Sequence, residues 1–91
     1  MTIRVQIPPV LRHECGGARE LSLPASTVRA ALDHLKHYYP ALYRNVCDET
    51  GAVRRHVNLF VNDSFLSQRE GLDTALAAGD VLTIMPAVSG G

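Results

Sequence analysis

Apolar and polar residues alternate in several stretches of this chain, and a period of two is typical of strands that bury one face. Residues 3–7 alternate in this way and end at Pro8-Pro9, because proline cannot donate a hydrogen bond to a strand ladder. Residues 57–61 and 81–85 alternate as well, and residues 21–23 indicate a strand that returns beside the first. We therefore expect a sheet whose first two strands form a hairpin with a long loop.

One stretch has the period of an amphipathic helix instead. Its apolar positions fall on one face at helical spacing: Val28, Ala31, Leu32, Leu35 and Tyr39. Ser26 or Thr27 can cap its start by accepting a hydrogen bond from a free N–H of the first turn. Pro40 ends or interrupts the helix, and residues 41–46 can add a further turn. We expect this helix to pack by its apolar stripe onto the flat face of the sheet.

The remaining segments are short. Phe65 and Leu66 predict a short strand or an anchored loop, and residues 72–77 predict a single helical turn. The order strand, strand, helix, strand, short elements and strand predicts an α+β fold, with one main helix lying across a mixed sheet. We expect one domain over residues 1–86 and a flexible tail over residues 87–91, which ends in two glycines.

The composition is that of a small domain whose partners are not chosen by bulk charge. The 91 residues can enclose one core, and nine basic residues balance nine acidic ones. This balance argues against nucleic acid and anionic membranes as partners. No apolar run is long enough for a signal peptide or a membrane span, so we expect a cytoplasmic protein. Cys15 and Cys47 lie far apart, outside any paired spacing, and are expected to be isolated reduced thiols.

The sequence does not indicate an active site built from side chains. His34 and His37 share the predicted helix, but no Asp, Glu or Cys at a neighbouring turn completes a metal site, so we interpret both as surface histidines. The motifs of nucleophile elbows, phosphate-binding loops, zinc-binding helices and dinucleotide folds are absent from the sequence. We therefore expect no metal, no bound cofactor and no enzymatic activity of the chain itself.

The terminal carboxylate of Gly91 is the remaining candidate for chemistry. It is ionised at neutral pH, since its unperturbed pKa is about 3.5, and as a carboxylate it is a poor electrophile. Converted to an acyl-adenylate it becomes a good one, and a sulfur nucleophile then gives a thiocarboxylate. Glycine at positions 90 and 91 suits this chemistry, because a chain without Cβ atoms can slide through a narrow channel to a buried nucleotide.

Four segments carry a resemblance to a known family. They are Ile7-Pro8-Pro9-Val10-Leu11-Arg12, the run VNLFVND at 57–63, the run GLDT at 71–74 and the run AGDVLTIMPAVSGG at 78–91. Together they resemble the MoaD/ThiS family of ubiquitin-like sulfur carriers, and most of all its branch that serves cysteine biosynthesis. The resemblance spans essentially the whole chain. Ser89 stands where relatives often carry alanine, a change from one small residue to another.

The resemblance implies a β-grasp fold and a reaction at the tail. It implies that a ubiquitin-activating-type adenylyltransferase and sulfurtransferase uses ATP to adenylate Gly91 and leaves a thiocarboxylate there. The sulfur is then handed to a biosynthetic enzyme such as a cysteine synthase, and a JAMM-type metalloprotease trims the adduct. We carry over only the terminal residues, with Gly91 as the reacting residue and Gly90 and Ser89 as the tail that reaches the partner.

The strand pattern adds a prediction about docking. If Leu82 and Ile84 face the helix, Thr83 and Met85 lie on the open face of the sheet. Phe60 faces the same way on a neighbouring strand, so Phe60 and Met85 are predicted to form an exposed apolar patch that docks partners.

Other functions remain open at this point. The chain can be the small subunit of a molybdopterin-synthase-like enzyme, with its tail held in a larger partner. It can be a ubiquitin-like protein modifier, although its single lysine, Lys36, argues against long chains of self-conjugates. It can also be an inert interaction module, whose activity would survive removal of Gly90 and Gly91.

Overall fold

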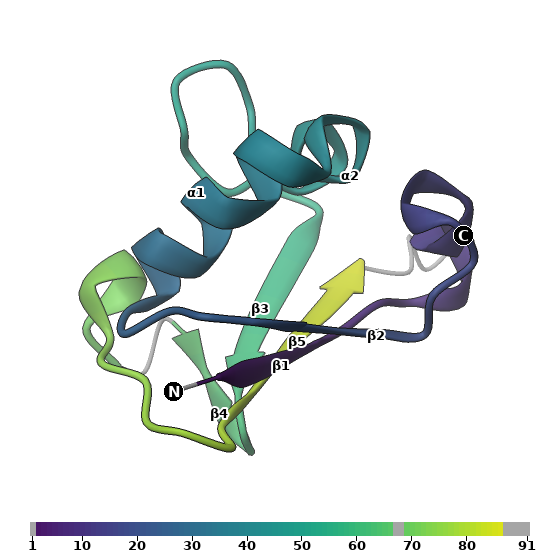
Figure 1. Ribbon diagram of the computed structural model, residues 1–91. Helices are drawn as coiled ribbons and strands as arrows, with labels where there is room; N and C mark the ends of the chain where they lie inside the picture. Colours follow the sequence, from purple (N-terminus) through teal and green to yellow (C-terminus); the bar gives the residue numbers. More distant parts are fainter. Residues whose placement is uncertain (1, 67–68, 87–91) are drawn as a thin grey trace.

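The computed structural model describes residues 2–66 and 69–86 (Figure 1). The strands in these residues are β1 (Ile3–Gln6), β2 (Glu20–Leu23), β3 (Val57–Val61), β4 (Ser64–Phe65) and β5 (Val81–Pro86). They form one sheet of order β2-β1-β5-β3-β4, in which β1 and β5 are parallel and the other neighbours are antiparallel. The predicted mixed sheet, with its opening hairpin of β1 and β2, is confirmed.

The first and last strands lie side by side at the centre of the sheet. The parallel pairing of β1 with β5 aligns Arg4 with Val81 and Gln6 with Thr83. Beyond Gln6 the chain reaches Pro8, where β1 leaves the sheet, because proline has no N–H for the ladder. β5 continues alone past this point on its β1 side, while it stays paired with β3 on the other as far as Pro86.

Two helices cover one face of the sheet (Figure 1): α1 (Val28–Tyr38) and α2 (Pro40–Val46). Thr27 is the cap of α1, since its hydroxyl oxygen accepts a hydrogen bond from the N–H of Ala30 at 3.1 Å. Pro40 begins α2 rather than extending α1, because the first turn of a helix needs no N–H from that position. The proline therefore divides the predicted helical region into two helices.

The core lies between the sheet and these two helices. Its largest fully buried side chains come from both layers: Ile3, Val5, Ile7, Leu23, Val61, Leu82 and Ile84 from the strands and their ends, and Val28, Leu35, Leu42 and Val46 from the helices. The alternation seen in the sequence is thus the alternation between this core and the opposite, open face of the sheet.

Two short helical segments complete the described fold. The loop between β1 and β2 contains a 3-10 helix, η1 (Pro9–Cys15), which buries Leu11 and Cys15 and was not predicted. A second 3-10 turn, η3 (Gly71–Asp73), confirms a helical turn in this region but begins earlier than the predicted residues 72–77.

The two cysteines are free and buried, as expected, and Cys47 is 1% exposed. Among residues 2–66 and 69–86, no helix has the length and apolar character needed to cross a membrane.

Candidate functional site

The predicted reacting residue Gly91 and its neighbours Gly90 and Ser89 lie outside the described residues. The strand that leads to them is β5, which ends at Pro86. Leu82 and Ile84 anchor β5 in the core, being 0% and 1% exposed. The tail, residues 87–91, therefore follows a strand that is held in the middle of the sheet.

The predicted docking residues Phe60 and Met85 lie on the same open face of the sheet. Phe60 pairs with Thr83, and Met85 pairs with Asn58, so Met85 stands diagonally across from Phe60. Diagonal neighbours of this kind are about 7–8 Å apart, within reach of long side chains. Met85 is 47% exposed and Phe60 is half-buried, which gives the open face an apolar spot at the end of β5.

Phe65 enlarges this apolar spot and was not among the predicted patch residues. It pairs with Phe60 across β3 and β4, and the two ring centroids are 4.4 Å apart. Its side chain is 43% exposed. β4 has two residues, too few to show an alternation, so the sequence offered no signal for the face of Phe65. We call Phe60, Phe65 and Met85 the open-face patch.

An apolar cavity of about 360 Å³ continues from the patch along the β4 edge. Asn58 and Phe65 border it, and its other walls include Val53, Leu66 and Leu72. A partner side chain inserted here would gain apolar contact next to the open-face patch.

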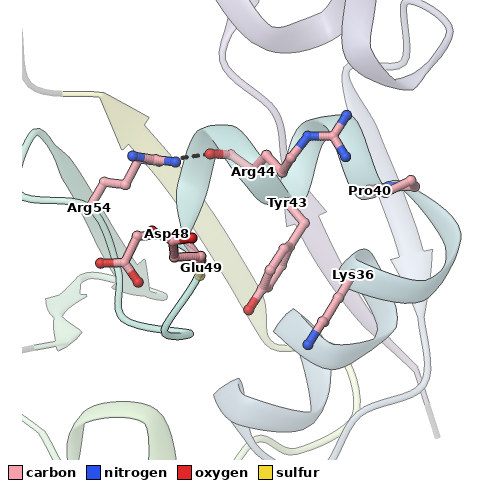
Figure 2. Close-up of a pocket in the computed structure, with 8 residues that line it drawn as sticks. Lys36, Pro40, Tyr43, Arg44, Asp48, Glu49 and Arg54 are labelled. Atoms are coloured by element: carbon pink, nitrogen blue, oxygen red, sulfur yellow. Dashed lines mark hydrogen bonds between the residues drawn. The ribbon is translucent and has the colours of Figure 1, made fainter.

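A larger cavity, of about 620 Å³, lies beside α2 and the loop before β3 (Figure 2). Lys36, Arg44 and Arg54 line it together with the carboxylates of Asp48 and Glu49. Arg54 is already engaged, because its Nε donates a hydrogen bond to the carbonyl oxygen of Arg44 at 2.7 Å.

Asp48 is also engaged within its own loop. Its Oδ1 accepts hydrogen bonds from the hydroxyl of Thr50 at 2.6 Å and from the backbone N–H groups of Thr50 and Ala52. The hydrogen bond from the Thr50 hydroxyl is the main reason why the pKa of this carboxyl lies below its ordinary value. The charged groups on this side of the cavity therefore stabilise the loop.

The side chains of the larger cavity include no activated nucleophile. Burial raises the pKa of the Cys47 thiol and also that of the Tyr43 hydroxyl, so both groups stay protonated at neutral pH. A buried, protonated thiol reacts slowly with electrophiles.

The two helical histidines contact one aromatic ring. The ring of Tyr38 lies 4.5 Å from that of His34 and 4.6 Å from that of His37, measured between centroids. Over the described ranges, no group of three or more His, Cys, Asp or Glu residues is placed to hold a metal ion.

This sheet order, with a helix packed across one face and a C-terminal strand at the centre, defines a ubiquitin-like β-grasp protein. The chain belongs to the ThiS family, whose model matches residues 5–91. It is 38% identical over 93 residues to the sulfur carrier protein CysO of Mycobacterium tuberculosis, and the match covers 100% of both chains. It is also 36% identical over 81 residues to small archaeal modifier protein 1 of Haloferax volcanii, which covers 86% of this chain and 88% of that one.

Solved structures agree with this assignment. Mycobacterium tuberculosis CysO superimposes with a TM-score of 0.85 at 36% identity, covering 94% of this chain and 99% of the other. The chain matched in the BexX/CysO complex of Amycolatopsis orientalis gives a TM-score of 0.88 at 31% identity, covering 98% and 99%. These matches establish the fold and the family.

Proposed function

We propose that this chain is a sulfur-carrier protein that bears its sulfur as a thiocarboxylate at Gly91. The single observation that carries the proposal is the 38% identity over the full length of CysO, a sulfur carrier. The match of the family model through residue 91 supports it, because the model includes the terminal residue that would react. The chain then acts as a co-substrate of other enzymes, not as an enzyme.

The chemistry proceeds in two balanced steps. A carboxylate oxygen of Gly91 attacks the α-phosphorus of ATP, which forms an acyl-adenylate and releases pyrophosphate. Hydrosulfide supplied with the activating enzyme then attacks the acyl carbon, and AMP leaves with the C–O bond electrons. After loss of the proton from sulfur, Gly91 carries a thiocarboxylate in place of its carboxylate. The chain supplies the acyl group, while the partner supplies ATP, sulfur and the catalytic side chains.

Partners of this chain dock on the open-face patch. Met85 lies near the end of β5, and Phe60 and Phe65 extend the patch across β3 and β4, so an enzyme that takes the tail into its active site also covers the patch. Aromatic and methionine side chains are enriched at the centres of protein interfaces. We propose two kinds of partner for this surface: an adenylyltransferase and sulfurtransferase that uses ATP, and a biosynthetic enzyme that accepts sulfur, such as a cysteine synthase. A JAMM-type metalloprotease would then trim the product from the tail.

The test is the intact mass of the protein after incubation with ATP, a sulfide source and the cognate adenylating enzyme. We expect a gain that equals the replacement of one oxygen by sulfur, localised to Gly91 by fragmentation. A chain that lacks Gly91 is the control and should show no gain. An unchanged mass with an enzyme that is active on another carrier would overturn the proposal.

A second function is favoured by one specific comparison, the 36% identity to small archaeal modifier protein 1. In this case an amine, rather than sulfur, would attack the acyl-adenylate of Gly91, and the product would be an isopeptide. Denaturing electrophoresis of lysates that express a tagged chain would show higher-mass conjugates that resist thiol reagents. If no such conjugates form and the thiocarboxylate mass is observed, sulfur transfer is the function that remains.

A further inference from the structure

A groove of about 200 Å³ opens where β1 leaves β5. Gln6 and Thr83 are the last paired residues of these two strands, and Pro8-Pro9 then carries the chain away toward η1. Pro8, Pro9 and Arg12 form one wall of the groove, and Thr83 and Met85 form the other. Because Met85 belongs to the open-face patch, the groove is continuous with the surface that we assign to partner docking.

Among the described residues that line this groove, Arg12 is the one with a charged side chain. It is half-buried, and its Nε donates a hydrogen bond to the carbonyl oxygen of Ile7 at 3.0 Å. This bond uses one N–H of the guanidinium and fixes its orientation. Among the described residues, no acceptor is bonded to the remaining N–H groups of the fork, which are on the two Nη atoms.

Glu14 and Glu20 have other partners. Glu14 pairs with His13 at 2.7 Å, and Glu20 pairs with Arg4 at 3.8 Å. Within residues 2–66 and 69–86, no carboxylate lies within ion-pair distance of the Arg12 guanidinium. A half-buried arginine held in one orientation has already lost part of the side-chain entropy that binding would cost.

We propose that Arg12 receives an aspartate or glutamate side chain of the adenylating enzyme when that enzyme takes in the tail. The inference rests on the proposed function, because only a partner that binds the tail is brought over this groove. Charge complementarity selects the occupant: a carboxylate is the planar anion that proteins offer to a guanidinium fork, and the described lining of the groove combines the Arg12 cation with neutral side chains.

The pair would orient the carrier as well as attract it. The apolar contacts of the open-face patch have little directional preference, whereas a guanidinium–carboxylate pair fixes a direction. With Met85 on one side and Arg12 on the other, the end of β5 would be held at two points before the tail enters the active site. Loss of the charge should therefore weaken encounter and docking more than the chemical step.

The experiment compares Arg12→Gln, Arg12→Lys and Arg44→Gln as substrates of the adenylating enzyme, with pyrophosphate release measured at low and high salt. Arg44 is an exposed arginine on α2, which covers the helical face of the sheet rather than the open face, so its removal is the matched loss of one charge. We expect Arg12→Gln to raise KM about tenfold with little change in kcat, and to flatten the dependence of KM on salt. Arg12→Lys should lie closer to the unsubstituted protein, and Arg44→Gln should equal it.

The hydrogen bond to Ile7 requires a second readout, because Arg12 also connects η1 to the end of β1. Lysine keeps the charge but loses the Nε donor, so an equal rise in KM for Arg12→Lys and Arg12→Gln would assign Arg12 to structure and overturn the inference. An unchanged KM for Arg12→Gln would overturn it too. Neither result contradicts the proposed function, which fails only if the unsubstituted protein gains no sulfur at Gly91.

Discussion

The rings of Phe60 and Phe65 contact each other on the open face of the sheet, with their centroids 4.4 Å apart and their planes inclined by 37°. A strand of two residues such as β4 gains little from its own ladder, and an aromatic pair of this geometry contributes about 0.5–1.5 kcal/mol beyond its buried area. The pair therefore holds β4 in place and keeps the aromatic part of the proposed docking surface fixed beside Met85.

Met85→Asp should weaken docking while it leaves the fold intact. Met85 is 47% exposed, so the substitution removes few core contacts, but it places a charge within the open-face patch. We expect KM for the adenylating enzyme to rise by about tenfold or more, as for a central interface residue. The midpoint of thermal unfolding should change little, since substitutions at exposed sites usually alter stability by less than about 0.5 kcal/mol.

Tyr38→Asp is the matched control for Met85→Asp, because Tyr38 is 62% exposed but lies on α1, on the other side of the sheet. It should leave KM unchanged. Equal effects of the two substitutions, or none from Met85→Asp, would remove the open-face patch from the docking surface.

The main elements of this fold could be predicted from the sequence because each buries one face along a regular period. Residues 3–7 and 57–61 alternate with the core as strands do, and α1 has an apolar stripe. By contrast, η1 begins at two prolines and buries only Leu11 and Cys15, which is too few positions to define a period.

The open-face patch was predictable only in part, for a similar reason. Alternation along β3 and β5 is enough to place Phe60 and Met85 on one face. The position of Phe65 depends on the register of a two-residue strand. The position of Arg12 depends on the path of the chain after Pro8. No local pattern in the sequence encodes this path or the register of β4.

Thr27→Ala should destabilise the protein by about 1 kcal/mol, because Ala30 then loses the acceptor for its N–H at the start of α1. For a domain of this size the midpoint of thermal unfolding should fall by about 4–8 °C. Ser26→Ala is the control, since the neighbouring hydroxyl does not cap the helix. If both substitutions had the same effect, the cap would not be specific to Thr27.

Asp80 should make stability depend on pH in the acid range. Its Oδ2 accepts a hydrogen bond from the N–H of Ala77 at 2.8 Å, which is the largest cause that lowers the pKa of this carboxyl from its ordinary value of 3.8, and Asn62 adds a second bond. Because the pKa of this carboxyl is lower in the folded state, the ionised carboxylate stabilises the fold at pH values above the pKa of the unfolded state. This stabilisation is lost as the pH falls through the pKa of the folded state.

Denaturant unfolding of Asp80→Asn from neutral pH down to about pH 2 tests this, because asparagine resembles the protonated side chain. The variant should be less stable than the unsubstituted protein above about pH 4, and the difference should shrink as the pH is lowered further. Asp63→Asn is the control: Asp63 is exposed, and its carboxylate accepts no hydrogen bond in the part of the chain that the structure describes. A difference that stays constant with pH would contradict the assignment.

Cys15 and Cys47 should take no part in sulfur transfer, although each bears a sulfur atom. Burial is the main cause that raises the pKa of both thiols, so they are protonated and inaccessible in the folded protein. Iodoacetamide should therefore add to neither thiol in the native protein and to both after unfolding. The double substitution Cys15→Ser with Cys47→Ala should still gain sulfur in place of oxygen at Gly91 when treated with ATP, sulfide and the adenylating enzyme. If the double variant fails to gain sulfur while remaining folded, the cysteines take part in the transfer and this prediction is wrong.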